Sequence, residues 1–169
     1  QLRGDETVIE VGPGRGSLTD RLAPKCGALI GIELDRELAP RLTQRYAGEP
    51  HVRIVEGNVL DLALGALAGG PYVLIGNIPY YITTPIVFHA LERPRAERAV
   101  FLVQREVAER MVASAGSENW GALSVNVQAL ARVELVFQVS ARAFSPRPKV
   151  ESSVVRLTPR ADPVVAQDE

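Results

Sequence analysis

The chain has 169 residues, of which 46% are hydrophobic and 23% charged, and its formal net charge is −1. These values exclude disordered and fibrous proteins and fit one globular domain with a sizeable core. No apolar run reaches the roughly 18 residues of a membrane span, and no secretory leader precedes the first strand-like segment, so we expect a cytoplasmic protein.

Charge, cysteine and histidine usage limit the kinds of site further. A near-neutral chain argues weakly against a nucleic-acid partner, but residues 91–160 carry 11 Lys and Arg against 7 Asp and Glu, and a local basic face is what phosphate binding needs. The single Cys26 cannot form an internal disulfide, and we expect it to be a buried structural residue. With only His51 and His89, far apart, we expect no metal site.

Along the first two thirds of the chain, apolar runs alternate with amphipathic segments. Strands are predicted over residues 7–12, 27–34, 51–57, 72–77 and 98–104, and helices over 16–23, 35–47, 83–93 and 105–115. This rhythm predicts right-handed crossovers and a parallel sheet with helices on both faces.

The rhythm changes after residue 115. A helix over 120–131 is followed by strands over 132–140 and 152–159, joined by the loop 141–151. That loop is too short for a parallel crossover, so the last two strands should be antiparallel. We therefore expect an α/β fold, mostly parallel with one antiparallel strand, over residues 1–160, and a tail over 161–169.

The segment "VIEVGPGRGSLT" places Gly12, Gly14 and Gly16 between a strand and a helix. Glycines there allow a tight turn and close approach of a nucleotide-like cofactor to free N–H groups. The spacing of the last two glycines does not match the dinucleotide fingerprint. Glu10, two places before the first glycine, would crowd a pyrophosphate but suit a cationic amino-acid group.

A second carboxylate, Glu33, ends the strand over 27–34. In dinucleotide-binding folds an acid at this place accepts the ribose hydroxyls. An adenosine with a positive charge and no pyrophosphate describes S-adenosylmethionine, and we expect this cofactor. The simpler alternative is a glycine-rich turn beside a solvent-exposed Glu33.

The stretch "LIGNIPYYITTP" puts an amide and two aromatic rings at the end of the strand over 72–77. The Asn77 side-chain oxygen and a nearby main-chain carbonyl, which Pro79 helps to hold, could accept two hydrogen bonds from an exocyclic amine. Tyr80 offers a face on which a planar base can stack. Such acceptors would localise the lone pair of an adenine amine toward a methyl sulfonium, without a strong general base.

Four motifs then resemble one known family. The segments "EVGPGRGSLT", "NIPYYITTP", "FLVQREVAERM" and "AFSPRPKVESSVVRL" are similar, in this order, to motifs of the ribosomal RNA adenine N6,N6-dimethyltransferases. Among these the chain most resembles the KsgA-type small-subunit (16S) enzymes. The resemblance implies a class I S-adenosylmethionine-dependent methyltransferase fold, with dimethylation of 16S rRNA in ribosome biogenesis. Separately, we expect a monomer.

The resemblance also assigns roles to residues. The residues expected at the cofactor are Glu10, Gly12, Gly14, Gly16, Glu33, Leu34, Asn58, Val59 and Asn77. The residues expected to hold the target amine are Asn77, Ile78, Pro79 and Tyr80, and those expected around the target base and its strand are Tyr80, Tyr81, Phe144, Pro146, Pro148 and Lys149. Without the family, the alternative is that Phe144 is a core anchor and that the prolines only rigidify a turn.

The chain departs from the family pattern in three ways. Asn58 stands where the family usually has Asp, and its amide oxygen can still accept from an adenine amine. The family's N-terminal Gly-Gln-(Asn/His)-Phe-Leu segment and its C-terminal helical domain have no counterpart in these 169 residues, and we expect these two differences to affect substrate affinity and turnover.

Three other functions remain open at this point. The macrolide-resistance enzymes methylate 23S rRNA on the same scaffold, although "PYYITTPI" and "PRPKVESSVVRL" are closer to the small-subunit enzymes. An RNA-binding assembly or transcription factor on this fold would not need Asn77, Tyr80 and the glycine loop. A DNA adenine methyltransferase shares the Asn-Pro-Tyr logic but not the "FSPRPKV" loop.

Overall fold

The computed structural model describes residues 2–144 and 148–163. Its strands are β1 (Thr7–Val11), β2 (Ala28–Glu33), β3 (Val52–Glu56), β4 (Tyr72–Asn77), β5 (Arg98–Gln104), β6 (Ala131–Val139) and β7 (Ser152–Pro159). Its α-helices are α1 (Thr19–Leu22), α2 (Leu38–Arg45), α3 (Leu64–Ala68), α4 (Thr83–His89), α5 (Arg105–Val112) and α6 (Ala122–Leu130). Short 3₁₀ helices are η1 (Ala23–Lys25), η2 (Val59–Asp61), η3 (Tyr80–Ile82) and η4 (Ala141–Ala143).

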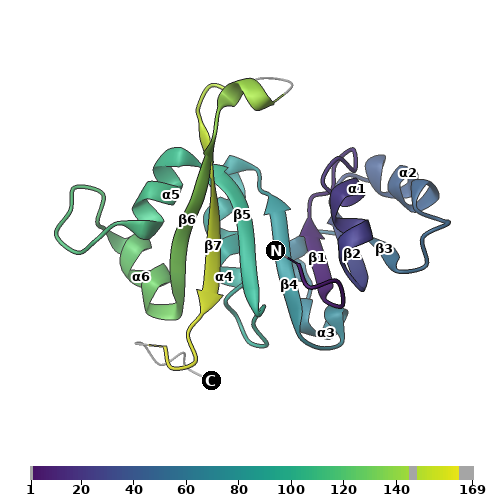
Figure 1. Cartoon of the computed structure of the whole chain (residues 1–169), viewed down its shortest axis with the longest axis horizontal. Helices are drawn as coiled ribbons and strands as arrows, with labels where there is room; N and C mark the ends of the chain where they lie inside the picture. The colour runs from purple at the N-terminus through teal and green to yellow at the C-terminus, as the bar shows by residue number, and fades with distance from the viewer. Residues whose placement is uncertain (1, 145–147, 164–169) are drawn as a thin grey trace.

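These strands form one sheet in the order β3-β2-β1-β4-β5-β7-β6 (Figure 1). The strands β1 to β5 pair in parallel, and β7 is antiparallel to both of its neighbours, β5 and β6. The predicted mostly parallel sheet with one antiparallel strand is confirmed. Only residues 140–151 separate β6 from β7, which is too few for a parallel crossover, so β7 runs antiparallel to β6.

The order of the strands reverses between β1 and β4, and this reversal places the site. The chain leaves β1 toward β2 and β3, then returns to β4 on the other side. Val11 at the end of β1 is in register with Gly76, so Gly12 and Asn77 emerge side by side. Open α/β sheets bind ligands at such a switch point, outside the carboxyl ends of the strands.

The β6–β7 connection lies at the same edge of the sheet. Gln104 at the end of β5 pairs with Ser152, and Ser152 pairs with Val139 at the end of β6. In Figure 1 this connection, with η4 in it, projects beyond the sheet at the top of the view. It therefore brings the aromatic and basic residues of the loop to the edge that carries Gly12 and Asn77.

The central strands are buried on both faces, as their near-continuous apolar sequences predict. Val8, Ile9 and Leu74 are fully buried, and so is almost all of the Glu10 side chain. Cys26 is buried in the smaller of two apolar clusters, beside Leu22, which agrees with a structural role. Within the described residues, no helix has the length and apolarity that crossing a bilayer requires.

Several elements differ from their predicted extent. The helix expected over 16–23 begins only at Thr19, because the glycine loop holds positive φ as far as Gly16. The helix expected over 35–47 begins at Leu38, and the Asp35 carboxylate accepts the N–H groups of Glu37 and Leu38 in the turn that precedes it. Helix α3 and the 3₁₀ turns were not predicted, because segments this short carry little periodic signal.

Candidate functional site

The glycine loop joins β1 to α1 and faces the switch point. Gly12, Gly14 and Gly16 have φ values of +65°, +60° and +84°, a region that side chains with a Cβ rarely adopt. A Cβ on Gly16 would also lie 2.6 Å from the Tyr46 hydroxyl oxygen. Gly16 is thus required by packing behind the loop, whereas Gly12 opens toward a cavity.

Glu33, at the end of β2, organises this loop. Its Oε2 accepts the N–H of Gly14 at 2.8 Å, and its Oε1 accepts the N–H of Asp35 at 2.9 Å. The residue is only 6% exposed, which rules out the simpler alternative of a solvent-exposed acid. Each carboxylate oxygen keeps further lone-pair capacity, so Glu33 can hold the two loops and still accept ligand hydroxyls.

A first cavity of about 380 Å³ lies over these residues. Its lining residues come from the ends of β1 to β4 and from η3 and α4, and they are Val11, Gly12, Ile32, Glu33, Leu34, Asp35, Gly57, Asn58, Val59, Pro79, Tyr81, Ile82 and Ile86. The aliphatic side chains offer apolar walls for a planar ring, and Glu33 and Asp35 offer acceptors for hydroxyl groups. This combination of acceptors and apolar walls fits a nucleoside-like group without a pyrophosphate, as the sequence predicts.

Not all of the residues expected at the cofactor line this cavity. Gly14 and Gly16 are absent from its lining, and Asn77 lines a different cavity. The Asn58 Oδ1 accepts the Leu60 N–H at 3.2 Å and so caps η2, while the residue still lines the cavity.

Glu10, also expected at the cofactor, is buried. It is 1% exposed and is absent from the cavity lining. Burial raises the pKa of its carboxyl to about 7, an effect that the hydroxyl of Thr19 opposes by donating to Oε2 at 2.7 Å and that the charges of Glu33 and Asp20 reinforce. The Glu10 carboxyl thus contacts the beginning of α1 through Thr19.

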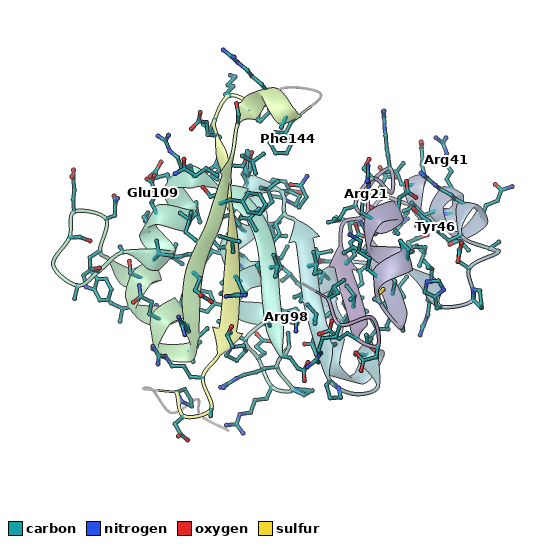
Figure 2. The ribbon with its side chains drawn as sticks, viewed as in Figure 1. Arg21, Arg41, Tyr46, Arg98, Glu109 and Phe144 are labelled. Carbon is teal, nitrogen blue, oxygen red and sulfur yellow. The ribbon has the colours of Figure 1, made fainter. Side chains whose placement is uncertain are left out.

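A second cavity of about 280 Å³ opens beside the first. Its lining residues are Asn77, Ile78, Pro79, Tyr80, Phe144 and Pro148, which combine the end of β4 with the β6–β7 connection. The predicted cluster of an amide, a main-chain carbonyl and two aromatic rings is thus brought together from residues far apart in sequence. In Figure 2, Phe144 lies beneath η4 at the upper edge of the sheet.

The geometry of this cavity is fixed by contacts that the sequence does not reveal. Ile78 is only 1% exposed, so its side chain anchors the motif in the core, and the residue still lines this cavity. The Tyr80 hydroxyl lies 2.8 Å from the hydroxyl of Ser152, a buried residue at the start of β7. Ser152 therefore positions Tyr80, and it is not among the site residues predicted from the sequence. Its one sequence signal is the pair of serines at the beginning of a largely apolar strand.

The two neighbouring tyrosines serve different cavities. Tyr80 lines the second cavity, whereas Tyr81, which we expected beside the target base, lines the first and is 84% exposed. Both lie in η3, where successive side chains point about 120° apart. Pro79 lines both cavities, so the two hollows meet at this residue.

A basic groove continues from the second cavity. It shares Pro148 with that cavity and is also lined by Ser140, Ala141, Arg142, Lys149, Val150 and Glu151. The Glu151 carboxylate is paired with Arg105 at 2.9 Å, which leaves Arg142 and Lys149 as the exposed cations of the groove. Pro146, also expected here, lies outside the described residues. Across the described part of the chain, no cluster of His, Cys, Asp or Glu is arranged to hold a metal ion.

Comparisons with known proteins agree with this geometry. A family model described as "Ribosomal RNA adenine dimethylase" matches residues 1–169. The "Ribosomal RNA small subunit methyltransferase A" of Acidobacterium capsulatum is 49% identical over 158 residues, which cover 92% of this chain and 56% of that protein. The chain therefore spans somewhat more than half the length of this relative.

Two solved structures are similar along nearly the whole chain. The crystal structure of the 23S rRNA methyltransferase ErmE superposes with a TM-score of 0.86 at 35% identity, covering 99% of this chain and 66% of that one. A dimethyladenosine transferase from Plasmodium falciparum gives a TM-score of 0.81 at 33% identity, covering 94% and 57%. The predicted class I methyltransferase fold is confirmed.

Proposed function

The chain belongs to the ribosomal RNA adenine dimethylase family, and we propose that it transfers methyl groups from S-adenosylmethionine to the N6 amine of adenine in small-subunit (16S) rRNA. The observation that carries the proposal is the meeting of two cavities at Pro79. One has the acceptors and apolar walls for an adenosine, and the other has the amide and aromatic rings for a second adenine. A methyl donor and its acceptor amine would meet there.

In the first cavity the chain binds and orients the cofactor. Glu33 accepts the ribose hydroxyls, Asn58 and Val59 contact the adenine ring, and Leu34 and Tyr81 cover the open side. When bound, S-adenosylmethionine supplies an electrophilic methyl group. Because Pro79 lines both cavities, the chain would hold the methyl donor and the target amine next to each other.

In the second cavity the chain positions the target adenine. The base stacks between Tyr80 and Phe144, and its amine donates to the Asn77 side-chain oxygen and to the Ile78 carbonyl. These two acceptors localise the nitrogen lone pair toward the methyl group. Positioning and electrostatics supply the rate gain, and the product cation releases its proton to water. An N6-methyl amine keeps one hydrogen for an acceptor, so a second transfer uses the same geometry.

The groove of Arg142 and Lys149 supports an RNA substrate. Both cations are exposed beside Pro148, where the strand that carries the target adenine would leave the second cavity. Phosphate groups are the natural partners of such a groove. We place the enzyme in the cytoplasm with the ribosomal particles it would modify, acting as a monomer through residues 1–160.

One alternative substrate has specific support. The ErmE structure, with a TM-score of 0.86, is named as a 23S rRNA methyltransferase. We favour 16S rRNA because the curated relatives that align at 42% to 49% identity carry the small-subunit name. The fold alone does not separate the two branches.

The test is a transfer assay with labelled S-adenosylmethionine, offering unmethylated small subunits and large-subunit RNA side by side. The expected result is label in 16S RNA, recovered as N6,N6-dimethyladenine. Label confined to 23S RNA would assign the chain to the alternative branch. Cofactor binding without label in either RNA would contradict the proposed activity for this chain.

A separate prediction concerns Glu33. Glu33→Ala is expected to weaken S-adenosylmethionine binding by roughly 1.5 to 3 kcal/mol, the value of a hydrogen bond to a charged group. The loss should lie at the upper end, because the substitution also frees the N–H groups of Gly14 and Asp35. Calorimetric titration measures it, with Glu37→Ala as a control that removes a nearby exposed acid. Equal affinities for both variants would exclude Glu33 from the cofactor site.

A further inference from the structure

A pocket distinct from the two cavities lies between the glycine loop and α2. It has a volume of about 270 Å³ and is lined by Gly14, Arg15, Leu38, Arg41, Leu42 and Arg45. Three of these six residues are arginines, and neither carboxylate of the first cavity is among them. The chemistry of this pocket is therefore opposite to that of the acidic first cavity on the other side of the loop.

The three guanidinium groups differ in how firmly they are held. Arg45 is fixed, because it donates to the Arg15 carbonyl at 2.8 Å and pairs with Asp20. Tyr46 strengthens this anchor, since its hydroxyl donates to Asp20 at 2.8 Å. Among residues 2–144 and 148–163, the guanidinium groups of Arg15 and Arg41 have no ion-pair or hydrogen-bond partner, and both residues are exposed.

We propose that this arginine pocket binds a phosphate group of the RNA substrate, at a point remote from the target adenine. One anchored and two unpartnered guanidinium groups around a single hollow create a positive potential that favours an anion. Planar guanidinium groups match phosphate oxygens in pairs of hydrogen bonds, which a surface lysine does not. Binding of a phosphate group as such is independent of methyl transfer, and only the choice of RNA as its source rests on the proposed function.

The position of the pocket fits an RNA that covers the whole edge of the sheet. Gly14 lines the pocket, while its N–H donates to Glu33 of the first cavity, so the two hollows flank one loop. Figure 2 shows Arg41 and Tyr46 at the α2 end of the molecule, and Phe144 beneath η4, nearer the middle of the same upper side. An RNA held at both places would pass over the two cavities with its target base turned inward.

The test compares two double variants that remove the same charge. Arg15→Ala with Arg41→Ala empties the pocket of its unpartnered cations but keeps the Arg45 anchor. Arg53→Ala with Arg132→Ala removes two exposed arginines near the beginnings of β3 and β6. These strand beginnings lie on the side of the sheet opposite to the two cavities. Equilibrium binding of unmethylated small-subunit rRNA is measured over a series of KCl concentrations, and binding of inorganic phosphate alone is measured by NMR titration.

For the pocket variant we expect RNA affinity about tenfold lower near 0.1 M salt and a salt slope smaller by about one, with S-adenosylmethionine affinity unchanged. The control variant should match the wild type. If the pocket variant loses inorganic phosphate binding but binds RNA normally, the pocket is a phosphate site whose ligand is a free phosphate compound and not the RNA. Equal RNA and phosphate binding in both variants would overturn the proposal. None of these readouts requires methyl transfer, so failure of the proposed activity is seen separately.

Discussion

Asn77→Ala is expected to lower the rate constant for methyl transfer by about a hundredfold or more, which corresponds to about 2.7 kcal/mol of transition-state stabilisation. The affinity for S-adenosylmethionine should change little. Asn77 lines the second cavity and is absent from the lining of the first. The substitution therefore removes an acceptor for the target amine and leaves the cofactor contacts in place.

The structure also indicates why this effect should not arise from misfolding. Asn77 is exposed at the last position of β4, and the buried Ile78 side chain holds the motif in place beside it. Truncating an exposed side chain here removes no core contact. A matched Asn126→Ala substitution on the exposed face of α6 should leave both rate and stability unchanged.

Single-turnover assays with saturating cofactor give the rate constant directly. Asn77→Asp keeps an acceptor oxygen at the same place, so its rate should fall between those of the wild type and the alanine variant. A rate for Asn77→Ala within a few-fold of the wild type would remove Asn77 from the proposed mechanism, whatever its effect on RNA affinity.

The fold could be predicted almost completely because its signals are local and repeated. Buried parallel strands read as short apolar runs, and the helices between them have a clear amphipathic period. The antiparallel position of β7 followed from the length of one loop. Helix α3, with five residues, was missed because it makes barely more than one turn.

The site was harder to predict because neighbours in sequence diverge in space. Tyr80 and Tyr81 are consecutive, yet the 3₁₀ geometry of η3 sends them to different cavities. Gly16 belongs to the glycine motif but serves contact with Tyr46, which is far away in the chain. Ser152 and the arginine pocket depend on contacts between distant segments, and no spacing rule reveals these.

Glu10 shows the same limit and carries the last prediction. The sequence suggests a carboxylate facing a cationic ligand, whereas the structure buries it in β1 with a pKa of about 7, raised chiefly by burial. Between pH 4.5 and 7 the folded state then keeps a proton that the unfolded state releases. The free energy of unfolding must therefore fall as the pH rises through this window, by about 3 kcal/mol for a shift of this size.

Glu10→Gln removes this titration while keeping the shape and the contact with Thr19. The difference in unfolding free energy between the variant and the wild type should shift by about 3 kcal/mol in favour of the variant as the pH rises from 4.5 to 8. Urea unfolding at several pH values measures it. A difference that stays constant with pH would mean that Glu10 is ionised in the folded state throughout.

Glu6 provides the matched control, because it is equally a buried glutamate and lies just before the same strand. Burial raises the pKa of its carboxyl, but the Arg3 N–H and the Arg98 guanidinium outweigh this and lower the pKa below its ordinary value. Its charge therefore stabilises the fold above pH 4.5, and this contribution is lost as the pH falls further. Glu6→Gln should destabilise the protein fully above pH 4.5 and less as the pH falls below 4.5, so between pH 4.5 and 8 its effect should stay constant while that of Glu10→Gln changes. The partner of each carboxylate, and not burial alone, decides the sign.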